Sequence, residues 1–590
     1  MREEKYTKLF LAAVLLFMFV TAATFYPAYA PYTDDYSWIL HCDYRFAHPG
    51  EWFTVGSTDY HVNYPGLTPP YLTANFRPLT ASFFYLASLS YAWTGYKSQL
   101  ALNHVLLIVI FFMYLKFLKR FTPLPPAARW MVSALFLVSP VWSDTYFSPS
   151  LRVHLLECAC TLAASLLLPT TLGGSLFRRV VPAAIVSAGA VFAHELGIVA
   201  PVAVAWTHYY GSCSVRDSRK TAAREAFLIL TISLGLYCAV RLALFQPPFQ
   251  SAYRGPRQEH PTSLVVGVLG VAMRLFFQSS QYLSGEGLLR GRLTLVGWSM
   301  ILFTIGFYAC LCVGLLRSWR NRCHLRLLTG CAVIAAIPVV FAVVPRHMCI
   351  VLIYCLPMAY LAVESVTSLD IKMLGIRSVG AALLAGASLI YIGAGVESFL
   401  RSRAYLYLLS GWNNSIRGTL VTAMGVGGRR LFLINDMSVN YSSLAMMQLT
   451  SKENGVTLVD PVVVNQLFVG GDQTPTLAHD TGVQVECRGD ILTTRIDLPA
   501  GRAFVFTHAE PNLLLTRANA SGGRYEFPDM RRSRYKTGVT GSIVENIDFG
   551  SRLIFTAPVS CDDVVVVGFP GNGPLKSKIF FVGSQQGFER

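Results

Sequence analysis

The stretch Leu9–Thr33, LFLAAVLLFMFVTAATFYPAYAPYT, holds 25 residues without a charge, and Asp34 and Asp35 follow it at once. A helix needs about 20 apolar residues to cross the hydrocarbon core of a bilayer, which is roughly 30 Å thick. The stretch is therefore predicted to span a membrane, with an acidic pair just beyond its end.

Ten further apolar runs follow along the chain. They are Leu100–Leu115, Met131–Ser143, Val153–Phe177, Val180–Ala193, Leu196–Gly211, Ala226–Val240, Leu293–Leu316, Leu327–Val344, Met348–Val363 and Ser378–Val396. The whole chain is 53% hydrophobic and only 14% charged, against about 25% charged residues in a soluble domain. This composition excludes a disordered chain, and the runs predict an all-α polytopic domain of about eleven transmembrane helices.

The formal charge of +16 suggests at first a nucleic-acid or membrane-surface protein. Lysine and arginine, however, gather at alternate ends of the runs, in segments 2–8, 116–129, 178–179, 216–224, 317–326 and 372–377. Positive residues mark cytoplasmic loops. The pattern therefore predicts an integral protein of the plasma or inner membrane, without nucleic acid, whose N-terminus is cytoplasmic and whose C-terminus is external.

Two helix-like stretches, Leu79–Tyr96 and Leu264–Leu283, would break this alternation if either crossed alone. They are predicted to lie on the external interface as amphipathic helices. A rival topology has both of them crossing. A second rival has the first segment cleaved as a signal peptide near Ala28–Ala30.

The last 190 residues differ in hydropathy from the rest and predict a separate domain. Residues 1–400 form the predicted membrane domain, with external segments 31–99 and 246–292, and residues 401–590 form an extracytoplasmic domain. Alternating apolar residues predict strands over 430–434, 483–487, 503–506, 551–555, 564–568 and 578–582. The domain is therefore expected to be β-rich or α/β, and a Cys487–Cys561 disulfide is left open.

Four groups of polar residues near the external ends of the runs are candidates for chemistry. Asp34 and Asp35 are a candidate general base or cation site, and a solvated loop pair is the simpler alternative. Arg77, before Pro78 at a helix start, can grip an anion; a snorkelling arginine is the alternative.

The other two groups lie deeper in the sequence. His194 and Glu195 interrupt an uncharged stretch, which indicates function at membrane depth or a pair that pins a turn. Arg346 and His347 can bind a phosphate at the leaflet boundary, with or without catalysis. Three further residues, Asp144, Arg152 and His154, are expected to line the same cavity.

The order of these features resembles a known family. An acidic pair after the first span, Arg-Pro-Leu-Thr at Arg77–Thr80, Gly95 and Asn103-His104 form a linked pattern. It resembles the integral-membrane glycosyltransferases of the GT-C superfamily that use polyprenyl-phosphate sugars, and within them the protein O-mannosyltransferase, or glycosyltransferase 39-like, branch. The similarity extends loosely over residues 1–365.

The resemblance implies an inverting transfer of a sugar from a polyprenyl phosphate to an acceptor hydroxyl on the external face. It implies Asp35 or Asp34 as the base, Arg77, Arg346 and His347 as donor-phosphate ligands, and Glu195 and His194 as donor or sugar ligands. The sequence departs from the family pattern in two places, with His194 where lysine is usual, and Pro345 and His347 flanking Arg346 in place of an acid and a tyrosine.

No metal ligand or certain cofactor is assigned from the sequence, although Asp34 and Asp35 leave a divalent metal open. The sugar and the acceptor, whether glycan, lipid or protein, are also open. Two other functions compete: a transporter or flippase, and a non-enzymatic envelope-glycan assembly protein.

Overall fold

The fold is taken from a computed structural model of the chain. It describes residues 2–31, 35, 39, 77–168, 176–211, 219–243, 295–318, 323–341, 348–367, 375–425, 430–434, 441–455, 459–467, 483–488, 491–497, 501–508, 514–518, 524–526, 539–547, 552–558, 564–568, 578–581 and 588–589. Among the predicted features, Asp34, Arg346, His347, Cys561 and the helix over Leu264–Leu283 lie outside these residues.

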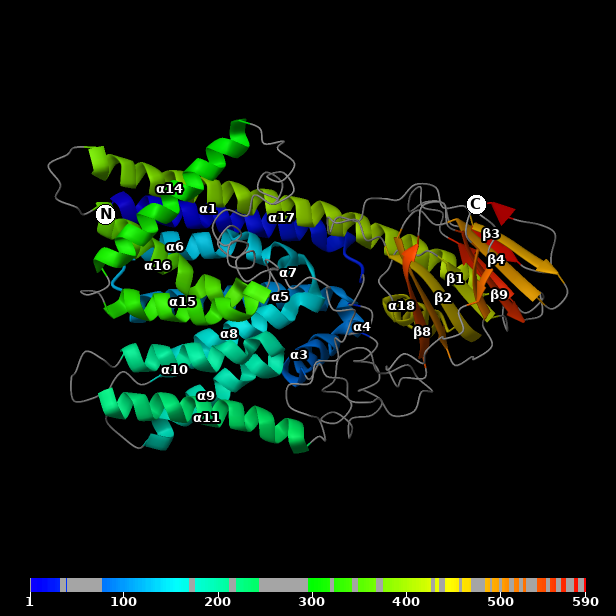
Figure 1. The fold of residues 1–590 in the computed structure, drawn as a ribbon, viewed down its shortest axis with the longest axis horizontal. Coiled ribbons are helices and arrows are strands. Elements are labelled where there is room, and N and C mark those ends of the chain that lie inside the picture. The colour runs from blue at the N-terminus through cyan, green and yellow to red at the C-terminus, as the bar shows by residue number, and fades with distance from the viewer. Residues whose placement is uncertain are drawn as a thin grey trace. The chain divides into compact units, whose positions relative to one another are not determined.

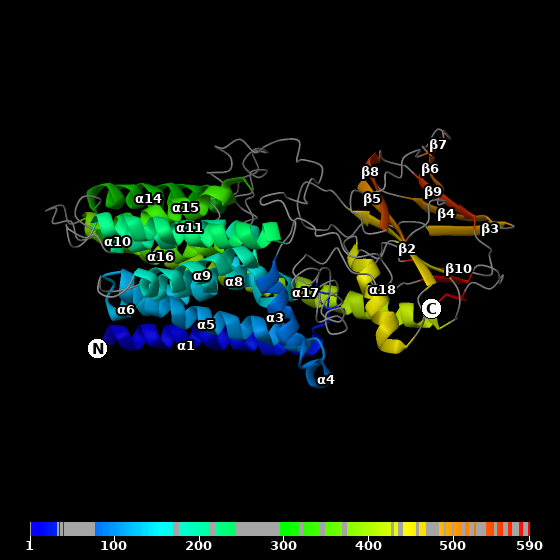
Figure 2. The same ribbon diagram turned by 90° about the horizontal axis from the view of Figure 1, so that it is seen from below.

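Contacts divide the chain into a helical unit, within Met1–Pro27 and Ala74–Leu406, and a second unit, within Ala28–Thr73 and Tyr407–Arg590. The long helices of the helical unit run side by side (Figures 1 and 2). They are α1 (Arg2–Phe25), α5 (Lys97–Phe121), α6 (Pro126–Val138), α8 (Arg152–Leu167), α9 (Leu176–Ala193), α10 (Val199–Gly211), α11 (Arg219–Ala243), α14 (Leu295–Ser318), α15 (Cys323–Phe341), α16 (Cys349–Thr367) and the part of α17 (Gly375–Met424) up to Leu406.

Each of the eleven predicted apolar runs overlaps one of these helices, although Met131–Ser143 continues past the end of α6 and Val153–Phe177 past the end of α8. Short elements connect them on one side, namely α3 (Pro78–Ser88), α4 (Tyr91–Thr94), α7 (Ser143–Phe147) and the single-turn helices η1 (Tyr26–Ala28), η3 (Pro140–Trp142), η4 (Pro149–Leu151) and η5 (Glu195–Ile198). With 11 residues, α3 is only about 17 Å long. It is too short to cross a bilayer, and α3 and α4 expose Leu86, Leu89 and Trp93.

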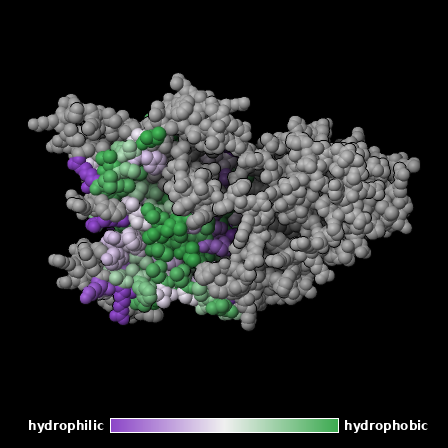
Figure 3. Space-filling model, viewed as in Figure 1, coloured by the Kyte–Doolittle hydropathy of each residue, from purple (hydrophilic) through white to green (hydrophobic). Residues whose placement is uncertain are grey.

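The exterior of the helical unit is unusually apolar. Large hydrophobic side chains stand exposed along several helices, such as Phe19 of α1, Phe112 of α5, Phe227 of α11 and Leu389 of α17. Figure 3 shows hydrophobic residues over the body of this unit and hydrophilic ones at the edge where Figure 1 places the N-terminus. Contiguous exposed apolar surface of this kind faces lipid in membrane proteins.

Four helical stretches are long and apolar enough to cross a membrane by themselves: Thr7–Ala28, Lys97–Phe121, Pro149–Leu167 and Lys220–Ala243. Shorter apolar helices cover Val180–Ala193, Ile305–Arg317, Cys323–Pro338 and Cys349–Ser365. Together with the apolar exterior, they identify an integral membrane protein.

Two glycines allow helices to approach closely. A Cβ on Gly314 of α14 would overlap the carbonyl oxygen of Ala362 in α16. A Cβ on Gly395 of α17 would overlap the carbonyl oxygen of Val138 at the end of α6. Small residues at such crossings let backbones meet, which is how helices associate in lipid, where burial of apolar surface supplies little drive.

The second unit contains helix α18 (Tyr441–Asn454) and two sheets. The seven-stranded sheet has the order β12-β11-β10-β1-β2-β5-β8, and the five-stranded sheet has the order β3-β4-β9-β6-β7. The strands are β1 (Arg430–Ile434), β2 (Val459–Leu467), β3 (Val483–Arg488), β4 (Ile491–Asp497), β5 (Gly501–His508), β6 (Leu514–Ala518), β7 (Arg524–Glu526), β8 (Val539–Ile547), β9 (Arg552–Pro558), β10 (Val564–Gly568), β11 (Lys578–Phe581) and β12 (Phe588–Glu589).

Strand direction differs between the two sheets. In the larger sheet β1 runs parallel to both β10 and β2, and the other pairs are antiparallel. In the smaller sheet every pair is antiparallel. Parallel neighbours need a crossover connection, and α18 supplies it between β1 and β2.

Candidate functional site

Six polar side chains at the ends of four helices of the helical unit form a connected group, here called the polar cluster. Its members are Arg77, His154, Glu157, His194, Glu195 and Cys349. Arg77 precedes α3, His154 and Glu157 stand in the first turns of α8, His194 and Glu195 follow α9, and Cys349 opens α16. Helix ends that are far apart in the sequence thus meet at one place.

The first link of the polar cluster joins Arg77 and Glu195, which are 118 residues apart. The Arg77 guanidinium donates to Glu195 Oε2 from Nε at 3.1 Å and from Nη2 at 2.9 Å. The Arg77 side chain is 15% exposed and that of Glu195 35%. Pro78 at the first position of α3 sets the helix start, and Thr80 Oγ1 donates to the Ala193 carbonyl at 2.9 Å, which holds α3 against the end of α9.

The second carboxylate oxygen of Glu195 has a different environment. Oε1 is buried, and among the described residues no hydrogen-bond donor reaches it. Burial alone raises the pKa of the Glu195 carboxyl, but Arg77 and His194 lower it by more, so that the net pKa lies below its ordinary value. The group is therefore an anion at neutral pH, with one oxygen placed to accept a bond from a ligand.

Glu157 is the hub of the polar cluster. Its Oε2 lies 2.8 Å from His154 Nδ1, and its Oε1 lies 3.1 Å from His194 Nδ1. Glu157 and His154 are almost completely buried, at 1% and 2% exposure. The i, i+3 spacing places His154 and Glu157 on one face of α8, and His194 reaches the carboxylate from the end of α9.

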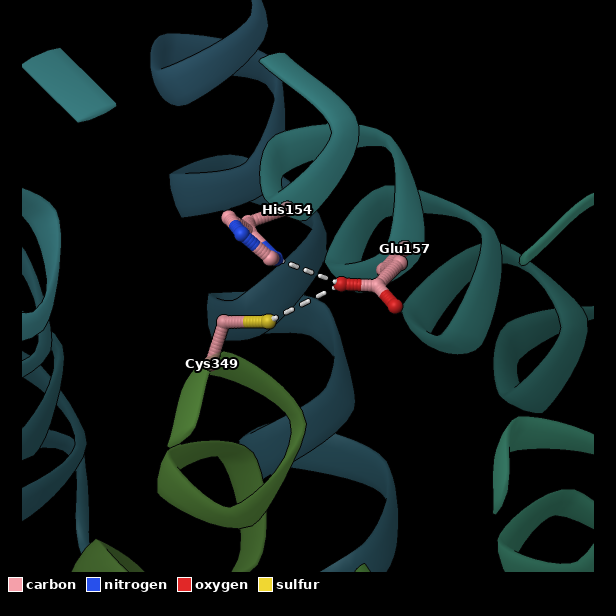
Figure 4. Close-up of side chains that lie close together, drawn as sticks. All are labelled: His154, Glu157 and Cys349. Atoms are coloured by element: carbon pink, nitrogen blue, oxygen red, sulfur yellow. Dashed lines mark hydrogen bonds and ion pairs between the residues drawn. The ribbon is translucent and has the colours of Figure 1, made fainter. Parts of the chain in front are cut away.

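Cys349 completes the group from α16. Its Sγ lies 3.8 Å from Glu157 Oε2, and the residue is fully buried. Figure 4 shows His154, Glu157 and Cys349 turned toward one another. Their ligand atoms all lie within 4.8 Å of one another, close enough to hold one metal ion.

A second buried network fixes the helices around the polar cluster. The guanidinium of Arg152 donates to Asn103 Oδ1 at 2.8 Å and to Gln99 Oε1 at 2.9 Å, and it lies 4.3 Å over the Phe84 ring. Asn103 in turn donates to the carbonyl oxygens of Thr145 and Ser148. This network ties α3, α5, α7 and α8 together, and so fixes where Arg77 can lie.

The fold brings some of the residues predicted from the sequence together and keeps others apart. Arg77, His154, His194 and Glu195 come together. Arg152 is instead part of the buried network, and Asp144 is exposed, where its Oδ1 accepts a bond from Ser402. Neither of these two belongs to the polar cluster, contrary to the expectation of a shared cavity.

Asp35 belongs to the second unit. It is fully buried, and its Oδ2 accepts a hydrogen bond from the Tyr29 hydroxyl at 3.1 Å. Asp34, Arg346 and His347 are not among the described residues.

Sequence reasoning missed Glu157 and Cys349. Glu157 had a usable signal, because it is the single acidic residue within the apolar run Val153–Phe177. An ionisable residue at such depth is a functional candidate by default. Cys349 had no such signal, because buried cysteines are common in apolar helices as small hydrophobic residues.

A cavity of about 300 Å³ lies elsewhere in the helical unit, between α10 and α15. Trp206, Tyr210, Arg326, Thr329, Gly330, Val333 and Ile334 line it. These residues belong to the C-terminal half of α10 and the N-terminal half of α15, whereas the polar cluster gathers at the opposite ends of the neighbouring helices. The cavity is thus not part of the polar cluster.

The sequence matches no protein-family model and no curated protein. Among solved structures, the chain is similar to apo ArnT from Cupriavidus metallidurans, with a TM-score of 0.47 and 13% identity over 82% of this chain and 96% of ArnT. The same ArnT bound to undecaprenyl phosphate gives a TM-score of 0.40 at 13% identity, with the same coverage. Arabinosyltransferase EmbB from Mycobacterium smegmatis gives a TM-score of 0.33 at 11% identity over 94% of this chain and 64% of EmbB.

Proposed function

We propose that the chain is an inverting membrane glycosyltransferase of the GT-C type. It transfers a sugar, of the hexosyl class, from a polyprenyl-phosphate donor to an acceptor hydroxyl on the external face of the membrane. The linked sequence pattern from Asp34 to His104 suggests this chemistry, and the contact between Arg77 and Glu195 is the observation that carries it. Two residues singled out independently in the sequence, 118 positions apart, meet in the fold.

The positions of the helix ends support an external location for the polar cluster. The polar cluster occupies the starts of α3, α8 and α16 and the end of α9. Basic residues lie at the opposite ends of the same bundle, where the Arg120 guanidinium at the end of α5 donates to the Leu166 and Leu168 carbonyls at the end of α8. By the positive-inside rule we propose that this end is cytoplasmic, and this supports a position for the polar cluster at the outer leaflet.

In the proposed reaction, the carboxylate of Asp35 or Asp34 accepts the proton of the acceptor hydroxyl. The acceptor oxygen attacks the anomeric carbon of the donor from the face opposite the phosphate. The bond between that carbon and the phosphate oxygen breaks, and polyprenyl phosphate leaves with the electron pair. Configuration at the anomeric carbon is inverted.

The leaving phosphate gains negative charge as this bond breaks, so donors fixed near it stabilise the transition state selectively. Arg77 is assigned this role together with Arg346 and His347. Glu195 holds the Arg77 guanidinium in orientation through two hydrogen bonds. With its unpartnered Oε1 and neighbouring His194, Glu195 is suited to accept a bond from a sugar hydroxyl.

The remaining assignments complete the proposal. Eleven helices span the membrane, residues 1–400 form the catalytic domain, and the strand-containing residues 401–590 form an extracytoplasmic domain. Reporter fusions after Arg326 and after Arg590 test the orientation. They are expected to read cytoplasmic and external respectively, and a cytoplasmic C-terminus would overturn the eleven-span topology.

Transfer is tested in membranes from cells that express the full chain, supplied with polyprenyl-phosphate mannose or glucose labelled in the sugar. Label is expected to pass from the lipid to a second product. General-base catalysis contributes about 10²–10⁴-fold, so Asp34→Asn with Asp35→Asn should lower the rate at least a hundredfold.

Asp144→Asn is the matched control, because Asp144 is an exposed carboxylate outside the polar cluster. It should retain full transfer. A double variant that transfers sugar at the wild-type rate would refute the mechanism. Lipid-linked sugar that changes sides without reaching an acceptor would indicate a flippase instead.

A further inference from the structure

We infer that His154, Glu157 and Cys349 form a binding site for a single divalent transition metal of the zinc class. None of the acidic residues considered in the sequence as metal ligands belongs to this set. The inference rests on the geometry of these three side chains and is independent of the proposed transfer reaction.

The donor set is of the kind that zinc prefers. Zn²⁺ in proteins takes four ligands from imidazole nitrogen, thiolate sulfur and carboxylate oxygen. Here one imidazole, one carboxylate and one thiol converge, with His154 Nδ1 at 2.8 Å and Cys349 Sγ at 3.8 Å from the same oxygen, Glu157 Oε2. Three protein ligands with a water in the fourth position are a common zinc arrangement.

These separations are close to those of a bound site. With bonds of about 2.0–2.3 Å, ligand atoms around a tetrahedral zinc lie roughly 3.3–3.7 Å apart. The His154 and Glu157 atoms must separate by about half an ångström, and Cys349 Sγ needs almost no shift. Side-chain torsions of this size require no movement of α8 or α16.

The arrangement of the ligands along the chain also favours a metal. His154 and Glu157 share one face of α8, at the i, i+3 spacing by which helical bundles present an imidazole and a carboxylate to a metal. The third ligand comes from the start of α16. A metal would therefore tie α8 and α16 together.

Charge is the physical reason for preferring a metal to a purely hydrogen-bonded group. His154, Glu157 and Cys349 are 2%, 1% and 0% exposed, and an uncompensated charge in such a place is costly. A divalent ion bound by one carboxylate, one thiolate and one neutral imidazole gives a site without net charge.

The test measures metal rather than sugar transfer. The full chain, purified without a histidine tag in mild detergent, is treated with chelator, reloaded with Zn²⁺ or Co²⁺ and desalted. About one zinc per chain is expected by elemental analysis, and cobalt should give a near-ultraviolet thiolate-to-metal charge-transfer band. Zinc should also raise the midpoint of thermal unfolding, because it binds the folded chain.

Cys349→Ser is expected to abolish the charge-transfer band and to lower the zinc content about tenfold or more. Cys355→Ser is the matched control, because Cys355 is a buried cysteine of the same helix that lies outside the polar cluster. It should keep the band, the zinc and the shift in midpoint. His154→Ala gives a second, sulfur-independent loss.

Three results would overturn the inference. One is wild-type protein that retains less than about a tenth of a zinc per chain after reloading. Another is a cobalt complex without a thiolate band, and the third is an equal loss in the Cys349 and Cys355 variants. Size-exclusion profiles identify variants that fail to fold. If the Cys349 variant is one of them, His154→Ala is used in its place, and the zinc-dependent shift in its unfolding midpoint should be lost.

Discussion

The ion pair between Arg77 and Glu195 gives a prediction whose size can be worked out from its geometry. At 2.9 Å, two unit charges attract by about 6 kcal/mol at an effective dielectric constant of roughly 20. That figure is an upper bound here, because the Glu195 side chain is 35% exposed and solvent screens it.

A double-mutant cycle isolates the interaction. Exposed pairs couple by about 0.2–1 kcal/mol, and truncation of one partner of a buried pair costs about 3–5 kcal/mol. The half-buried Arg77–Glu195 pair should lie between them, with a coupling free energy of about 1–2 kcal/mol in the cycle of Arg77→Gln, Glu195→Gln and the double variant. This corresponds to a 5- to 30-fold change in the unfolding equilibrium constant, at about 1.4 kcal/mol per tenfold.

The cycle is measured by reversible unfolding in mixed micelles, titrated with dodecyl sulfate and followed by tryptophan fluorescence. The chain offers a matched pair for comparison in Arg401 and Glu397 of α17, whose side chains are 46% and 54% exposed at i, i+4 spacing. Its coupling should stay below about 0.5 kcal/mol. If the coupling at Arg77–Glu195 were no larger than this, the pair would not hold α3 to the end of α9 as argued.

Two further predictions concern packing within the helical unit. Gly395→Ala should destabilise the chain by about 1–3 kcal/mol, because its Cβ would overlap the Val138 carbonyl. The control is Gly393→Ala in the same helix, whose Cβ meets no atom within 4 Å and which should be neutral or slightly stabilising. Equal shifts in the unfolding midpoint of the two variants would contradict the close packing of α6 against α17. Asn103→Leu removes an acceptor from the buried Arg152 guanidinium and should lower the free energy of unfolding by about 2–4 kcal/mol in the same assay. The control is Ser82→Ala, which removes only a bond to the Pro78 carbonyl within α3 and should lower it by less than about 1 kcal/mol. An Asn103 variant as stable as the Ser82 variant would show that the network does not order these helices.

Much of the helical unit follows from the sequence because the bilayer imposes a strong rule. Backbone groups in lipid must be satisfied within a segment, so an uncharged run of sufficient length forms a helix. Each of the eleven predicted runs overlaps one long helix of the structure, although boundaries shift and Val153–Phe177 extends from α8 to the first residues of α9. The α11 helix, for example, begins at Arg219 rather than at Ala226, because polar residues continue its first turns into the basic segment.

The positions of some strands in the second unit could also be predicted from the sequence. Alternation placed segments at 430–434, 483–487 and 564–568, which coincide with or lie within β1, β3 and β10. The order of strands within the sheets could not be predicted from the sequence. Register and neighbours depend on contacts between segments more than 100 residues apart, as between β1 and β10, and local pattern carries no information on such pairs.

For the site, the sequence alone determined which residue types were out of place. A charge in or beside an apolar run stands out because its desolvation is costly, and that criterion identified Arg77, His194 and Glu195. The tertiary structure decided which of these meet. It joined Arg77 to Glu195, made Glu157 the hub between two histidines, and assigned Arg152 to a buried network instead. The reason is physical: periodicity fixes the face of one helix, whereas a site built from the ends of α3, α8, α9 and α16 depends on how those helices pack.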